Sequence, residues 1–261
     1  MDLNKFEPKV LNYNTPLLFL HGMWHASWCW EEFIEYFTDA GFTCYTFDLR
    51  EHGKERFPKG IRWKSISNYV EDLESATQLI GNPVVIGHSM GGFILQKFLE
   101  RHDPPATIFV APSPHYGNIM ATFKFIRHYP LQFLRMIGTF NMKAMITSKD
   151  RYAKMFLTEG TDVDSNFEKV QNEAFRAYLD TVIFNLPKVG KIKKTVSDPD
   201  NLLLVAGEKD SFFSPKTLEK TATKYGAHFK VFKGLGHNMM VGPGSDDVAS
   251  YCVDFLSARL S

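Results

Sequence analysis

Short apolar runs alternate with segments of helical periodicity in the first part of the chain. The runs are rich in aliphatic and aromatic residues and predict buried strands, which we place at 17–20, 42–47, 84–87 and 107–110. Between them, apolar residues recur about every three or four positions, as on one face of a helix. Ser67 is placed to cap one such helix, and Gly81 to end it. Because strands that alternate with helices are typical of a mostly parallel sheet flanked by helices, we predict an α/β fold.

The pattern changes after the fourth expected strand. Residues 115–187 hold helical segments rich in Phe and Met and no convincing strand, and Pro130 is expected to break the first of these helices. A helical insertion after a sheet strand is typical of a lid over the carboxyl edge, where ligands of open α/β sheets bind. We therefore divide the chain into a core, 1–111 and 188–261, and a helical cap, 112–187. Most Phe and Met side chains of the cap are interpreted as core, and a minority as pocket lining.

The alternation of strands and helices resumes in the last part of the chain. An apolar run at 202–206 predicts a buried strand, and Ser214-Pro215 is typical of the start of a helix, which Gly226 ends. A further strand is predicted at 228–232, and an amphipathic helix begins at Ser245. These elements extend the same α/β sheet.

The strand at 84–87 stops at a Gly-x-Ser-x-Gly pentapeptide centred on Ser89, and helix-forming residues follow at once. A sharp turn from strand to helix at a serine is a nucleophile elbow. Side chains in place of Gly87 and Gly91 are expected to collide with the neighbouring strand and helix, and the serine is expected in a strained conformation. Free amides at the helix N-terminus would favour the negative charge that develops in acyl transfer.

A serine hydroxyl needs a base that removes its proton and later returns it to the leaving group. Among the nine histidines, His237 stands in a loop directly after a late strand, downstream of Ser89. Asp210 follows the preceding strand at the same edge and is the candidate acid that orients the imidazole. The chain order Ser89, Asp210, His237 is the order expected for this type of elbow. Asp48 is a rival acid, which we interpret as part of a structural loop.

Composition and charge limit the choice of partner. The chain has 261 residues and a formal net charge of +1, so a broad electrostatic case for nucleic acid is missing and a small or neutral partner is favoured. Cys29, Cys44 and Cys252 lack a Cys-x-x-Cys spacing, which argues against a zinc site and favours a reducing compartment. No apolar run has signal-peptide or membrane-spanning length. We expect a cytoplasmic protein without a membrane partner, and a homodimer is left open.

Together these motifs resemble the α/β-hydrolase superfamily across nearly the whole chain. The His-Gly loop within 20–30, rich in His and Trp, is similar to that of plant methylesterases, hydroxynitrile lyases and related bacterial esterases. The resemblance implies that the backbone N–H groups of Met23 and Met90 form an oxyanion hole. The lyases have threonine where this chain has Gly22, and lysine where it has Asn238, so the departure favours ester hydrolysis over cyanide chemistry.

Several side chains near these motifs are candidates for the substrate pocket. They are Trp24, His25, His88, His115 and Met239. Most of them also have a structural interpretation: His88 can orient the loop within the pentapeptide, and Trp24 can belong to the core. For His25 and His115, an ordinary core or surface histidine is the favoured interpretation.

The expected function is hydrolysis of small to medium, apolar carboxylic esters through an acyl-enzyme. This is a carboxylesterase-like activity (EC 3.1.1) that requires no metal and no cofactor. Lactonase, thioesterase and C–C hydrolase activities are alternatives that use the same triad. A ligand receptor without catalysis, built on a hydrolase scaffold, is the alternative of a different class. Multiple turnovers on ester substrates would separate an enzyme from a receptor.

Overall fold

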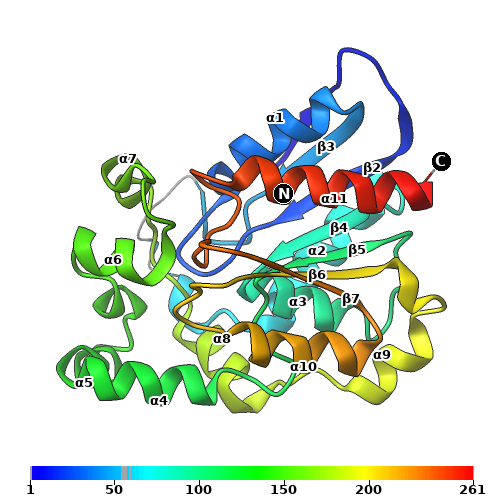
Figure 1. Ribbon diagram of the computed structural model, residues 1–261. Coiled ribbons are helices and arrows are strands. Elements are labelled where there is room, and N and C mark those ends of the chain that lie inside the picture. Colours follow the sequence, from blue (N-terminus) through cyan, green and yellow to red (C-terminus); the bar gives the residue numbers. More distant parts are fainter. Residues whose placement is uncertain (1, 54–57, 59, 261) are drawn as a thin grey trace.

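A computed structural model describes residues 2–53, 58 and 60–260 of the chain. These residues form one seven-stranded sheet in the order β1-β3-β2-β4-β5-β6-β7 (Figure 1). Strand β1 runs antiparallel to β3, and the other neighbouring strands are parallel. The strands are β1 Leu3–Phe6, β2 Tyr13–Leu20, β3 Phe42–Phe47, β4 Val84–His88, β5 Thr107–Val110, β6 Leu202–Gly207 and β7 His228–Phe232. The predicted α/β class with a mostly parallel sheet is confirmed.

Helices cover both faces of the sheet, and alternate strand residues face opposite sides. Leu17 and Phe19 of β2 pack with α1 and α11, whereas Leu18 and Leu20 pack with α2, α3 and α10. Because both faces are buried, the central strands have nearly continuous apolar sequences. These helices are α1 Glu31–Asp39, α2 Ile66–Ile80, α3 Met90–Phe98, α10 Pro215–Tyr225 and α11 Ser245–Leu260.

The N-terminal cap of α2 differs from the prediction. Ser65, not Ser67, caps the helix: its hydroxyl accepts a hydrogen bond from the Asn68 N–H, and the Asn68 side chain accepts one from the Ser65 N–H. The helix begins two residues earlier than expected because Ile66 is fully buried and belongs to the apolar face. The predicted end at Gly81 is confirmed, with a φ of 90° that favours glycine.

Between β5 and β6 the chain is helical and contains no strand, all of these residues being described. The predicted break at Pro130 is confirmed, since α4 ends at His128 and α5 begins at Pro130. The helices here are α4 Ile119–His128, α5 Pro130–Thr139, α6 Lys149–Phe156, α7 Val163–Glu168, α8 Phe175–Leu179 and α9 Val189–Thr195. Shorter helical elements in the chain are η1 Ser27–Trp30, η2 Ile61–Trp63, η3 Met142–Met145, η4 Asp180–Phe184 and η5 Pro199–Asn201.

The helices α4 to α7 lie together at one end of the sheet, on the left of Figure 1. Helix α9 instead packs against α10 on a face of the sheet. Within the described part of the chain, no helix is both long enough and apolar enough to cross a membrane.

Candidate active site

Ser89 stands on the sharp turn between β4 and α3. Its backbone has a φ of 52° and a ψ of −113°, a conformation that non-glycine residues rarely adopt, so the expected strain is present. A β-carbon on Gly87 would lie 2.8 Å from the Gly91 carbonyl oxygen, and one on Gly91 would lie 2.5 Å from the Leu20 carbonyl oxygen. Glycine is therefore required at both positions, because the elbow packs directly on its own helix and on the end of β2.

Three side chains that are distant in sequence form one hydrogen-bonded chain. The Nε2 atom of His237 lies 2.9 Å from the Ser89 Oγ, and its Nδ1 lies 2.8 Å from the Asp210 Oδ2. Because the carboxylate can only accept, His237 donates through Nδ1–H, which leaves Nε2 free to accept the serine proton. The other Asp210 oxygen accepts hydrogen bonds from the backbone N–H groups of Phe212 and Phe213. The carboxylate is thus fixed and fully paired.

Close backbone contact between two loops brings His237 to Asp210. A β-carbon on Gly207, the last residue of β6, would lie 2.2 Å from the Gly236 carbonyl oxygen. The loop after β7 therefore rests on the end of β6, and the Lys209 N–H donates to the Leu235 carbonyl at 2.8 Å. Sequence patterns alone do not reveal this contact.

The rival acid Asp48 has a different environment. Its Oδ1 accepts hydrogen bonds from the backbone N–H and the hydroxyl of Ser27, at 2.7 and 2.6 Å. This carboxylate holds the loop before α1, and the hydrogen bonds of the described residues do not join it to His237. The arrangement fits the structural interpretation of Asp48.

The loop that contains Met23 lies directly against the elbow. A β-carbon on Gly22 would lie only 3.0 Å from the Ser89 Cβ. Met90 is the first residue of α3, so its N–H has no partner within the helix. Neither the Met23 N–H nor the Met90 N–H donates a hydrogen bond to any described residue. Both amides therefore remain candidates for the oxyanion hole that the resemblance implies.

The peptide group between Met23 and Trp24 is hydrogen-bonded through both its carbonyl and its N–H. The Met23 carbonyl accepts a hydrogen bond from the His25 Nδ1–H at 2.6 Å, and the Trp24 N–H donates to the Glu173 Oε2 at 3.4 Å. The Trp24 carbonyl accepts from the Gln171 N–H at 2.9 Å, and Trp24 has a φ of 64°. Sequence analysis did not identify Gln171 or Glu173, because their partners lie far away in the chain.

Glu173 is a buried carboxylate with several donors. It accepts hydrogen bonds from the Tyr69 hydroxyl at 3.2 Å and the Ala174 N–H at 2.6 Å. It also pairs with His52 at 3.2 Å, and neither of the two side chains is exposed. Burial alone would lower the pKa of His52, but the Glu173 carboxylate raises this pKa above its ordinary value. This buried pair lies beneath the Met23 loop, because the same carboxylate binds the Trp24 N–H.

The other histidines under the site behave in the opposite way. Burial lowers the pKa of His25 to about 3, and burial together with nearby His237 holds the pKa of His88 well below its ordinary value. Burial, followed by the effect of His52, also lowers the pKa of His21. These imidazoles are neutral at physiological pH and act as fixed hydrogen-bonding groups.

A cavity of about 180 Å³ opens next to Ser89 and His237. One water needs only roughly 10–15 Å³, so the cavity has room for an organic substrate. The sheet edge, α4 and α6 supply its walls, which are mainly apolar and aromatic. They include Met23, Trp24, Ala121, Phe125, Met145, Met155, Phe156, Phe212 and Phe213, with Ser113, Asn118, Thr122, Lys124, His128, Tyr129, Lys154, Tyr178 and Ser211 as more polar members.

The structure places one of the five expected pocket residues, Trp24, in this lining and the other four elsewhere. His25 is fully buried behind the Met23 loop, where its Nε2 accepts a hydrogen bond from the Asn238 side chain at 2.9 Å. His88 is fully buried beneath the elbow, and its Nε2–H donates to the His237 carbonyl at 3.2 Å. Both side chains support the site from behind.

The remaining two expected pocket residues lie outside the cavity lining, in segments that follow β5 and β7. His115 is half-buried against α10, where its ring nitrogen is 3.2 Å from the Thr221 hydroxyl. Met239 is buried in the core between the sheet and the pair α1 and α11. Each residue follows a sheet strand in the sequence, but His115 contacts α10 and Met239 packs in the core, so neither lines the cavity.

The described residues contain no group of three His, Cys, Asp or Glu side chains arranged to hold a metal ion. The thiols of Cys29, Cys44 and Cys252 are free and buried. Burial raises the pKa of each thiol, so none is a reactive thiolate.

Comparison with known proteins gives consistent matches over most of the chain. Residues 17–250 match the model of a family described as the alpha/beta hydrolase family. A monoacylglycerol lipase of Mycolicibacterium smegmatis is 23% identical over 252 residues, which cover 90% of this chain and 87% of the lipase.

Solved structures extend this comparison. A thermophilic esterase from Thermogutta terrifontis superposes with a TM-score of 0.76 at 17% identity, covering 100% of this chain and 94% of the esterase. The monoacylglycerol lipase of Paleococcus ferrophilus has a TM-score of 0.69 at 18% identity, with 99% and 100% coverage. At these identities the likeness shows a shared fold.

Proposed function

The chain belongs to the alpha/beta hydrolase family, and from this premise we propose that it is a serine hydrolase that cleaves carboxylic esters through an acyl-enzyme. The observation that carries the proposal is the hydrogen-bonded chain from Ser89 through His237 to Asp210, with distances of 2.9 and 2.8 Å. The named relatives, an esterase and monoacylglycerol lipases, agree with ester hydrolysis.

In the acylation step, the Ser89 oxygen attacks the ester carbonyl while His237 Nε2 takes the serine proton. Asp210 stabilises the imidazolium that forms. The Met23 and Met90 amides donate to the oxyanion, and a single donor of this kind contributes about 3–4 kcal/mol to the transition state. When the carbonyl re-forms, the alcohol leaves with the proton from His237, and the acyl group remains on Ser89.

In the deacylation step, His237 removes a proton from water, whose oxygen attacks the acyl-enzyme. Collapse of the second tetrahedral intermediate releases the carboxylic acid, and His237 returns the proton to Ser89. The cycle uses one ester and one water and gives one acid and one alcohol, without a metal or cofactor.

The cavity lining supports small to medium, apolar esters. Most of its side chains are aliphatic or aromatic, so they favour an acyl or alcohol group that is transferred from water. Helices α4 and α6 contribute part of this lining, which supports the division into a core, 1–111 and 188–261, and a cap, 112–187, that acts as a lid.

A panel of p-nitrophenyl esters with increasing acyl length tests the proposal. We expect multiple turnovers, with a preference that reports the size of the cavity, and their loss in Ser89→Ala. The same panel, extended to lactones and thioesters, separates the alternative hydrolase activities. Tight binding of these compounds without turnover would instead identify a receptor.

A further inference from the structure

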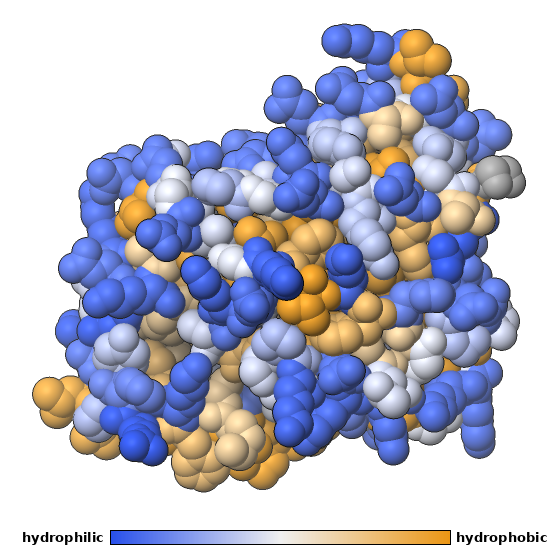
Figure 2. Space-filling model, in the orientation of Figure 1, coloured by the Kyte–Doolittle hydropathy of each residue, from blue (hydrophilic) through white to orange (hydrophobic). Residues whose placement is uncertain are grey.

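The outward sides of α4 and α5 expose large apolar side chains. Met120 and Phe123 on α4 are 68% and 60% exposed, and Leu131 and Leu134 on α5 are 74% and 64% exposed. Each pair is three positions apart, so its members share one face of their helix. We call this four-residue surface the α4–α5 face. Hydrophobic side chains gather at the lower left edge of Figure 2, where Figure 1 shows α4 and α5.

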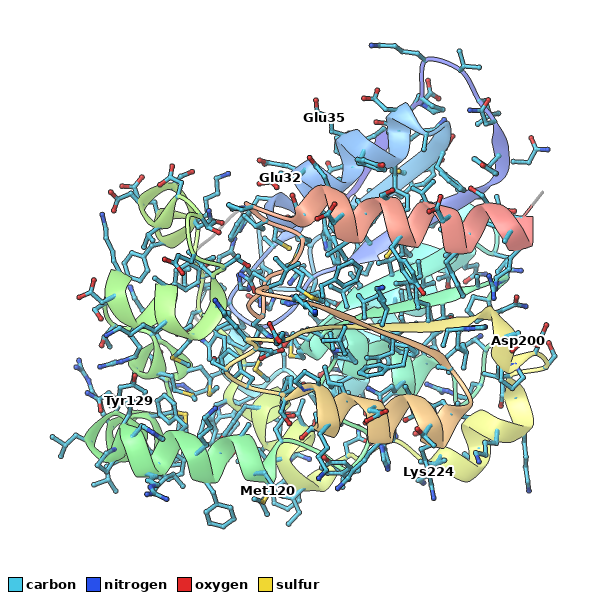
Figure 3. The ribbon with its side chains drawn as sticks, viewed as in Figure 1. Glu32, Glu35, Met120, Tyr129, Asp200 and Lys224 are labelled. Carbon is cyan, nitrogen blue, oxygen red and sulfur yellow. The ribbon has the colours of Figure 1, made fainter. Side chains whose placement is uncertain are left out.

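Further exposed apolar residues lie beside the α4–α5 face. Ile183 and Phe184 of η4 are 57% and 64% exposed, and η4 contacts α4. Met120 and Tyr129, which mark the two ends of α4, are labelled on this side of the molecule in Figure 3. Because soluble monomers rarely expose clusters of this kind, the surface indicates a binding partner.

The charged residues of the segment that contains the α4–α5 face all have the same sign. Residues 104–149 contain no Asp or Glu, although the whole chain is nearly neutral. The same segment has five Lys and Arg residues, of which Lys124, Arg127 and Arg135 are exposed on α4 and α5 themselves. An apolar face with a basic border is typical of helices that lie in the interface of an anionic membrane.

The same helices border the opening of the candidate active site. Lys124, His128 and Lys154 line the cavity and are exposed, so the cavity reaches the surface beside the α4–α5 face. The cavity and the α4–α5 face therefore share helix α4.

We propose that the α4–α5 face binds the surface of an anionic lipid bilayer, and that the ester substrate is an amphiphile taken up from that surface. The binding step stands independently of catalysis, and the uptake step rests on the proposed function. The expectation of no membrane partner considered only spanning segments, whereas this proposal concerns contact with the bilayer surface. A symmetric dimer through this face is disfavoured because it would bring Arg127 and Arg135 of two copies together.

Vesicle flotation tests the binding step. The Ser89→Ala protein is mixed with phosphatidylcholine vesicles that contain, or lack, phosphatidylglycerol. We expect flotation with the anionic vesicles that decreases at high salt. The triple change Phe123→Ser, Leu131→Ser and Leu134→Ser should lower binding by about 100-fold. Arg127→Gln and Arg135→Gln should each lower it by about fivefold, on anionic vesicles only.

The matched control is Leu79→Ser, since Leu79 is 68% exposed but lies on α2. It should bind as the parent does. Absence of flotation, or equal loss in the control and the triple variant, would overturn the proposal. The proposal would also be overturned if sedimentation velocity found a dimer of the parent that the triple variant breaks into monomers, while the parent did not bind vesicles.

An activity assay tests the uptake step separately. When Ser89 is kept, the triple variant should hydrolyse a soluble p-nitrophenyl ester at the rate of the parent, because none of its three positions lines the cavity. Its rate on a long-chain ester embedded in anionic vesicles should fall by about the same factor as vesicle binding. Unchanged rates on both substrates would overturn uptake from the surface. If no ester is hydrolysed while flotation persists, the proposed function fails and membrane binding stands.

Discussion

Glu173 and His52 form a hydrogen bond with an Nε2–Oε2 distance of 3.2 Å, and both side chains are completely buried. The same carboxylate accepts a hydrogen bond from the Trp24 N–H, so a residue of the helical insertion fixes the loop of the expected oxyanion donor Met23. Glu173 does not line the cavity. It is therefore a positioning residue, which acts through the loop.

Replacing Glu173 should affect stability and catalysis in different ways. Glu173→Ala leaves buried His52 and the Trp24 and Tyr69 donors without their acceptor and should lower the free energy of unfolding by about 3–5 kcal/mol. Glu173→Gln keeps only one acceptor oxygen, whereas Glu173 accepts from Tyr69 through Oε1 and from Trp24 and His52 through Oε2. The variant should therefore displace the Met23 loop and lower kcat by about 10- to 100-fold with little change in KM. Urea unfolding and steady-state kinetics measure both effects. Glu168→Gln, at an exposed position nearby, is the control. A kcat of Glu173→Gln equal to that of the parent would show that the loop needs no such anchor.

Acid should destabilise the protein through its buried neutral histidines. The pKa of His25 is lowered to about 3 and that of His88 lies well below its ordinary value of 6.5, so below pH 6.5 the unfolded chain binds protons that the folded chain does not. Each such histidine should lower the free energy of unfolding by about 1.4 kcal/mol per pH unit in this window.

His52 contributes with the opposite sign. Because its pKa is raised, its contribution to stability is complete below pH 6.5 and is lost as the pH rises through the folded-state pKa. Urea unfolding between pH 7 and pH 5 measures the sum of these contributions to the free energy of unfolding. His25→Gln should reduce the dependence of the free energy of unfolding on pH by about 1.4 kcal/mol per pH unit, which is the contribution of one bound proton. A stability that does not change over this range would contradict neutral burial of these imidazoles.

Gly22 should tolerate no side chain if the Met23 loop is to stay against Ser89. A β-carbon there would meet the His88 Nδ1 at 2.8 Å and the Ser89 Cβ at 3.0 Å. We expect Gly22→Ala to lower kcat by about 100-fold, because a displaced loop loses an oxyanion donor. Gly190→Ala is the control, since a β-carbon at Gly190 in α9 meets nothing within 4 Å. Equal kcat values for the two variants would show that the loop adjusts without loss of function.

The sequence predicted the site best where the signal is local. The elbow at Ser89 combines a strand, two required glycines and a helix, and Asp210 and His237 each follow a recognisable strand. The sequence did not show which side chains are buried or which distant residues are in contact. His115 is near the sheet edge in sequence, but it packs against α10, and Glu173 meets Trp24 from 149 residues away.

The apolar residues of α4 and α5 show the same limit. Their periodicity predicted helices correctly, but Phe and Met in an insertion were interpreted mainly as core. Phe125 and Met136 are indeed buried, whereas Phe123 is exposed. A hydrophobic pattern gives the spacing of a face, and only the packing of neighbouring elements decides whether that face is covered.

Covalent trapping with a fluorophosphonate tests the central claim most directly. The Ser89 oxygen should displace fluoride from phosphorus, so intact mass and peptide mapping should find one phosphonyl group on Ser89. Ser89→Ala should remain unlabelled, while Ser113→Ala, which removes another serine of the cavity lining, should be labelled as the parent is. A parent that stays unlabelled, or a Ser89→Ala protein that is still labelled in the cavity, would contradict the assignment of Ser89 as nucleophile.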